Sequence, residues 1–168
     1  MAENVSYELD EDDVEETEDT LEGKYLTFSV GKEDYGIAIS YVIEIIGRQE
    51  ITDVPELPNY VKGFINLRGK IIPVIDVRLK FKMSPVDYND RTCIVVIAIN
   101  ETYIGLIVET ISDVISIPEQ TIVPPPDKKT GFNNRYIKGI GKVDNDVKLL
   151  IDCDKLFMDE EMEVLSNI

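Results

Sequence analysis

Residues 60–81, YVKGFINLRGKIIPVIDVRLKF, describe a structural unit that the 168-residue chain contains twice. A shift of 76 positions (60 to 136) lays this stretch over residues 136–157, YIKGIGKVDNDVKLLIDCDKLF, with Tyr, Lys, Gly, Ile, Asp and Phe in matching places. Each copy has two apolar runs separated by a short turn sequence, LRGK at 67–70 or VDND at 143–146. This pattern is typical of a β-hairpin. The chain is therefore organised around a duplicated hairpin.

The self-similarity continues upstream of both hairpins. Residues 25–46 align with residues 94–115 at a shift of 69 positions (25 to 94), and the extra length of the second copy falls in its proline-rich connection. We therefore expect two copies of one unit, at about 24–82 and 92–158. An isolated core of about 60 residues is marginal, so the two copies are expected to pack on each other as a pair of small domains.

Short Val- and Ile-rich runs separated by turn residues favour β structure over long helices. The first unit is expected to contain five short strands, the number typical of a small barrel, at 24–30, 35–39, 48–52, 63–67 and 71–77. Residues 40–46 fit either a short helix capped by Ser40 or the start of a strand. The second unit repeats this order, with a possible turn at 109–114. A terminal helix is expected over about 154–165, capped by Asp152 or Asp154.

The net charge of −16 is concentrated at the N-terminus. Residues 1–23 contain eleven acidic and no basic side chains, and the rest of the chain has 17 basic and 22 acidic ones. Such a self-repelling block predicts a disordered acidic tail, serving either solubility or a specific contact. This charge argues against nucleic acid and anionic membranes as partners, and no apolar run approaches the roughly 20 residues that span a bilayer. A cytoplasmic location is expected, with Cys93 and Cys153 as buried, inert thiols.

The sequence contains few of the residues and motifs that enzymes use. It has no histidine, which removes the commonest general base and metal ligand. The Gly-Lys pair at 69–70 is followed by Ile71, where a phosphate-binding loop needs Ser or Thr. The acidic residues of 144–154 match no calcium loop, and the two cysteines match no zinc pattern. Neither a cofactor nor a metal is expected, and catalysis by Asp76 and Asp152 is the weak enzymatic alternative.

Arg68 stands out at the tip of the first hairpin because its counterpart in the second copy is Asp144. A tight turn requires the positive φ that Gly69 supplies, but it does not require an arginine. Glu44 is likewise a carboxylate among apolar neighbours. We therefore predict a recognition role for Arg68 and hypothesise an ion pair between Arg68 and Glu44.

The motifs of the first copy closely resemble those of the CheW family of chemotaxis coupling proteins. The resemblance rests on NLRG at 66–69, followed by IPVID at 72–76 and by Arg78, and it extends to DYND at 87–90 and SDV at 112–114. It covers about residues 24–168 and implies an all-β fold of two intertwined five-stranded SH3-like β-barrels with short helices. It also implies a non-catalytic adaptor. The expected partners are the regulatory domain of the histidine kinase CheA and the cytoplasmic tip of methyl-accepting chemoreceptors, in receptor arrays at the inner membrane.

The resemblance also implies partner-binding positions, which carry over to this chain by motif as Val42, Glu44, Gly63 and Arg68. Ile111 is the equivalent of Val42 in the second copy and is a weaker candidate. The positions that contact the kinase are not assigned. The alternative function is a generic SH3-like module that binds short peptides, although such modules usually line their groove with aromatic side chains and this chain has no tryptophan.

Overall fold

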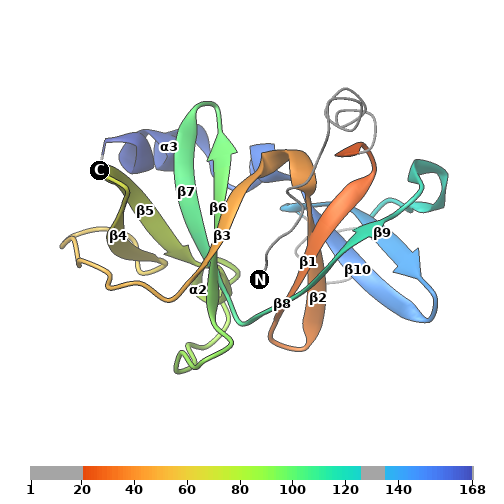
Figure 1. The fold of residues 1–168 in the computed structure, drawn as a ribbon. Helices are drawn as coiled ribbons and strands as arrows, with labels where there is room; N and C mark the ends of the chain where they lie inside the picture. Colours follow the sequence, from red (N-terminus) through yellow and green to blue (C-terminus); the bar gives the residue numbers. More distant parts are fainter. Residues whose placement is uncertain (1–20, 126–134, 168) are drawn as a thin grey trace, which may run out of the picture.

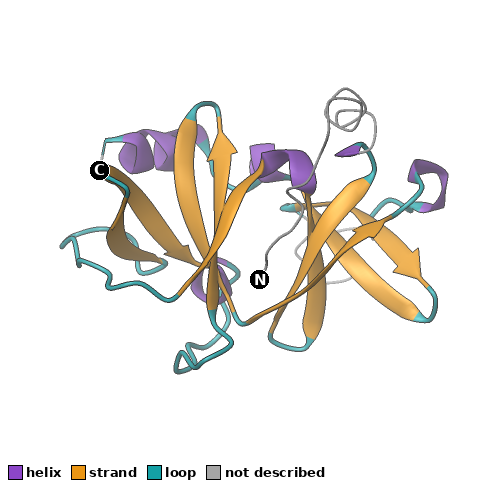
Figure 2. Cartoon of the chain, in the orientation of Figure 1, coloured by secondary structure: helices purple, strands orange, loops and turns teal. Residues whose placement is uncertain are grey.

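The computed structural model describes residues 21–125 and 135–167, and their fold is dominated by β-strands (Figures 1 and 2). Most of the predicted acidic tail, 1–23, lies outside the described residues. Within them the strands are β1 (Lys24–Val30), β2 (Glu33–Ala38), β3 (Val42–Gly47), β4 (Val61–Leu67), β5 (Lys70–Asp76), β6 (Cys93–Ile99), β7 (Thr102–Val108), β8 (Thr110–Ser116), β9 (Ile137–Val143) and β10 (Asp146–Ile151).

The strands form two five-stranded sheets, which confirms the predicted fold class. Sheet A has the order β8-β1-β2-β10-β9, and sheet B has the equivalent order β3-β6-β7-β5-β4. Each sheet therefore combines the first two strands of one repeat with the last three strands of the other. The ranges 24–82 and 92–158 describe the sequence repeat, but they do not bound the two sheets.

In the second repeat, the length of one connection explains this exchange. Only Glu109 separates the end of β7 from the start of β8, whereas even a tight hairpin needs two loop residues to turn the chain back. The chain therefore runs on into the other sheet. In the first repeat, the 3₁₀-helix η2 (Ile39–Tyr41) occupies the corresponding place between β2 and β3. Figure 1 shows β3 and β8 crossing between the two halves of the molecule in opposite directions.

Two local predictions were wrong, and one ambiguity is resolved. The possible turn at 109–114 belongs mostly to β8, and residues 40–46 combine a 3₁₀ turn with strand β3. The strand expected at 48–52 is reduced to an isolated bridge, in which Thr52 N donates to Phe64 O at 2.9 Å and Phe64 N donates to Thr52 O at 3.0 Å. This bridge connects the segment after β3 to β4 and so closes the open side of sheet B. A bridge between Val123 and Ile140 does the same in sheet A.

The largest hydrophobic cluster, called here the shared core, contains side chains from both sheets. Phe28 and Ile37 come from sheet A, and Ile97 and Leu106 come from sheet B; all four are at most 1% exposed. A smaller cluster around Ile72 belongs to sheet B alone. The main core therefore joins the two sheets, as expected for repeats too small to bury enough surface separately.

Short helices follow the two hairpins. Asp76 caps α2 (Val77–Lys80), and its side chain accepts a hydrogen bond from Leu79 N at 3.3 Å. Asp152 caps the 3₁₀-helix η5 (Cys153–Lys155) in the equivalent position. A further 3₁₀-helix, η3 (Glu119–Thr121), follows β8.

The terminal helix, α3 (Asp159–Ser166), begins five residues later than predicted. Asp152 and Asp154 therefore cap or belong to the preceding 3₁₀ turn and not to this helix. Met158 occupies the cap position of α3, where the Glu161 carboxylate accepts a hydrogen bond from Met158 N at 2.8 Å.

Candidate functional site

The hairpin between β4 and β5 holds Arg68 in an unusual backbone conformation. Arg68 has φ of +54° and Gly69 has φ of +86°, and the turn is fixed by Asn66 Oδ1, which accepts from Gly69 N at 2.9 Å. Two-residue hairpin turns with positive φ at both positions prefer Asn-Gly or Gly-Gly. A bulky side chain is disfavoured at the first position, so the turn alone does not account for an arginine.

Arg68 forms the ion pair with Glu44 that the sequence suggested. Its Nη1 and Nη2 donate to Glu44 Oε1 and Oε2, both at 2.6 Å. The hydrogen bonds from Arg68 hold the pKa of Glu44 below its ordinary value. This side-by-side geometry fixes both side chains more tightly than a single contact would. Because β3 and the β4–β5 hairpin lie at opposite ends of the order of sheet B, the pair ties its two edges together.

The second repeat has no equivalent of this pair. The positions corresponding to Glu44 and Arg68 are Asp113 and Asp144, so both carry a negative charge. Asp113 Oδ1 instead accepts a hydrogen bond from Val114 N at 2.8 Å. The same two positions therefore carry an ion pair in the first repeat and two aspartates in the second.

Exposed isoleucines lie on the same two elements as the ion pair. Ile43 and Ile45 on β3 are 47% and 43% exposed, and Ile71 at the start of β5 is 45% exposed. Val42 is half-buried and packs against the shared core. Arginine is enriched at protein interfaces, and exposed apolar side chains can supply the area that an interface buries.

Gly63 and Ile111, the other two predicted partner-binding residues, lie apart from the ion pair. Gly63 is buried in β4 with φ of +138°, and a Cβ atom there would lie 2.0 Å from Thr52 O. Its role is thus to admit the closing bridge of sheet B. Ile111 lies in sheet A, pairs with Phe28 and packs half-buried against the shared core. The structure thus brings together Glu44 and Arg68, with Val42 on the strand of Glu44.

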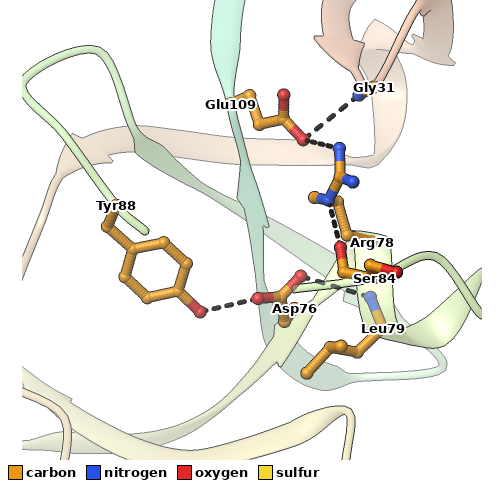
Figure 3. Close-up of polar contacts among 7 residues, drawn as sticks. All are labelled: Gly31, Asp76, Arg78, Leu79, Ser84, Tyr88 and Glu109. Carbon is orange, nitrogen blue, oxygen red and sulfur yellow. Dashed lines mark hydrogen bonds and ion pairs between the residues drawn. The ribbon is translucent and has the colours of Figure 1, made fainter. Parts of the chain in front are cut away.

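Sequence reasoning missed a polar network around the crossover residue Glu109, shown in Figure 3. Arg78 Nη1 donates to Glu109 Oε2 at 2.8 Å, and Gly31 N donates to the same oxygen at 3.1 Å. Arg78 Nε donates to Ser84 O at 2.7 Å. The network joins α2, which follows sheet B, to the β1–β2 turn of sheet A. The unexplained arginine two residues after Asp76 was the available signal for it.

Asp76 has a structural role in the same region (Figure 3). It is 4% exposed, and Tyr88 Oη donates to its Oδ2 at 2.7 Å while its Oδ1 caps α2. Both oxygens are therefore occupied by internal donors. This explains the Asp-x-Arg part of the family motif through local structure and leaves Asp76 poorly suited to acid–base chemistry.

The remaining candidates for chemistry are clusters of possible metal ligands and the two cysteines. The described residues contain no cluster of three or more side chains that could hold a metal ion. Burial raises the pKa of the Cys153 thiol to about 12, while Cys93 is half-buried and its pKa is also raised by burial. No helix within 21–125 and 135–167 is long and apolar enough to cross a membrane.

Comparison with known proteins identifies the family. The model of the CheW-like domain matches residues 24–161. The chain belongs to the CheW family. It is 35% identical over 150 residues to the chemotaxis protein CheW of Klebsiella aerogenes, covering 89% of this chain and 90% of that protein. It is 33% identical to CheW of Bacillus subtilis, covering 82% of this chain and 88% of that protein.

A solved structure agrees with this assignment. The scaffolding protein TtCheW of Thermoanaerobacter tengcongensis has 37% sequence identity and a TM-score of 0.75, covering 80% of this chain and 92% of that chain. The CheW-like fold of two SH3-like barrels is thus supported by sequence and structure together.

Proposed function

We propose that this chain is a non-catalytic adaptor that joins methyl-accepting chemoreceptors to the histidine kinase CheA. Membership of the CheW family makes it a chemotaxis adaptor and favours this function over a generic peptide-binding module. The finer proposal is that the chain contacts the cytoplasmic tip of the receptor and the regulatory domain of CheA directly, in the cytoplasm beside the receptor array.

The Arg68–Glu44 pair is the observation on which we place the receptor-facing surface. The pair is bidentate, and the elements that carry it also carry exposed isoleucines. The second repeat has aspartates at both equivalent positions. We assign Arg68 and Glu44 to orienting the partner, and Val42 and its exposed neighbours to apolar contact. Complementary charges mainly set orientation and specificity, whereas buried apolar contacts supply affinity. Gly63 and Ile111 would act indirectly, by maintaining the sheets that carry this surface.

Binding measurements with single and paired charge variants test this assignment. Arg68→Ala is expected to weaken binding of a receptor signalling fragment about tenfold or more, as truncation of a central interface arginine does. Asp144→Ala, at the equivalent tip of the second hairpin, is the matched control and should leave binding unchanged. If Arg68→Glu and Glu44→Arg each weaken binding, the double variant should recover part of it. Equal binding by the wild type and Arg68→Ala would show that Arg68 does not belong to the receptor-facing surface.

A further inference from the structure

Lys80 is a buried cation at the end of α2, and its surroundings come from both repeats and from α3. Its side chain is 5% exposed, and its Nζ lies 2.5 Å from Glu161 Oε2 on α3. The rings of Tyr60, Tyr136 and Phe157 lie 4.5, 5.1 and 5.1 Å from Nζ. The Tyr60 hydroxyl also donates to Glu161. Glu161 therefore supplies the counter-charge for a lysine enclosed by aromatic rings.

The second repeat shows that the fold does not require a charged residue at the position of Lys80. The equivalent of Lys80, at a shift of 76 positions, is Leu156, which is 2% exposed and part of the shared core. A buried ion pair is often no more stabilising than apolar residues in its place, but losing one partner leaves an uncompensated charge that is strongly unfavourable. Loss of the Lys80–Glu161 contact would therefore strongly weaken the docking of α3.

The rest of α3 is held by few contacts. It has eight residues, and Leu165 is its only buried side chain, with Met162 half-buried against the shared core. Arg135 Nη2 lies 4.0 Å from Glu161 Oε1, so this longer contact converges on the same carboxylate. A helix of this length is not stable alone in water. Segments with few buried apolar contacts open at lower free energy than the core around them.

We infer that α3 is a releasable latch, closed by the contact of Glu161 with Lys80 over the place where the two repeats meet. Figure 1 shows α3 lying along one side of the molecule next to β7, outside both sheets. It can leave without breaking any strand pairing. Opening removes the counter-charge of Lys80 and uncovers a cationic, aromatic surface formed by both repeats. The latch is independent of the partners proposed above.

Hydrogen exchange of the full chain under native conditions tests the latch. In the wild type, amides of residues 163–166 are expected to open at least about tenfold more often than those of Ile97 and Leu106 in the core strands. Glu161→Gln should raise opening of α3 about a further tenfold, with the core amides unchanged. Glu160→Gln is the matched control, because Glu160 lies on the same helix and is exposed.

A double variant separates the lysine charge from the packing of the helix. In Lys80→Met with Glu161→Gln the cation is gone and an acceptor for the Tyr60 hydroxyl remains, so protection of α3 should return toward the wild-type level. Opening as frequent as in Glu161→Gln would overturn the role of Lys80. Exchange of α3 and the core strands at the same rate in the wild type would show that α3 opens only with the whole protein, which would overturn the latch itself.

Discussion

Replacing Gly63 with alanine is expected to disrupt the bridge between Thr52 and Phe64 that closes sheet B. The added Cβ would lie 2.0 Å from Thr52 O and 2.8 Å from Thr52 C, both backbone atoms. Neither can move away like the end of a flexible side chain. The variant must therefore break the two hydrogen bonds between Thr52 and Phe64 or shift the whole segment after β3.

The cost follows from the contacts that are lost. Two backbone hydrogen bonds contribute about 1 kcal/mol each, and a non-glycine residue at φ of +138° adds about 1–3 kcal/mol of backbone strain. Gly63→Ala should therefore lower the free energy of unfolding by about 3–5 kcal/mol, a large part of the 5–15 kcal/mol typical of a folded domain.

Urea unfolding of the full chain measures this loss, with Gly139→Ala as the matched control. At Gly139 the nearest obstacle is the side-chain methyl Cγ2 of Ile122, at 2.5 Å, and φ is not positive. Repacking that side chain should cost only about 1–2 kcal/mol. Receptor-fragment binding by Gly63→Ala should fall in proportion to the unfolded fraction. Equal destabilisation by the two substitutions would refute the backbone-clash explanation.

Three further predictions concern topology, charge and the N-terminus. Residues 1–83 or 84–168 expressed alone should stay unfolded by circular dichroism and fold when mixed, because each sheet takes strands from both halves; a folded single half would contradict the exchange. The pKa of Glu44 is lowered from 4.5 in the folded state, so the stabilisation it gives is present above pH 4.5 and is lost as the pH falls through the folded pKa. Urea midpoints should therefore decline less below pH 4.5 in Glu44→Gln than in the wild type, and parallel declines would disprove this. Removing residues 1–20 should shift the thermal midpoint by less than about 2 °C, since the first strand begins at Lys24; a larger loss would show that the segment packs on the sheets.

The repeat made the local structure of this protein predictable from sequence. The duplicated hairpin, the turn at Arg68 and Gly69 and the all-β class all depend on residues close together in the chain. The sequence of each repeat does not show which strands join which sheet, because strand exchange depends on the direction in which the chain leaves β2 and β7. The end of β7 at Val108 can be predicted from the sequence, but the start of β8 at Thr110 cannot, because residues 109–114 also fit a turn.

Parts of the candidate site were predictable for the same reason. The Arg68–Glu44 pair could be suggested because both residues were out of place locally: a long side chain in a tight turn and a carboxylate among isoleucines. The contacts of Arg78 with Glu109 and of Lys80 with Glu161 span 31 and 81 residues. Arg78 was out of place as an arginine two residues after Asp76, but nothing local to Lys80, Glu109 or Glu161 indicated the partner that each would meet.

Sedimentation velocity of a three-component mixture tests the central claim most directly. The full chain would be mixed with the regulatory domain of CheA and with a receptor signalling fragment, each pair being run separately as a control. The adaptor account predicts a species that contains all three proteins and that is absent when this chain is omitted. Only two-component complexes, with each partner displacing the other, would contradict the claim that this chain joins receptor and kinase.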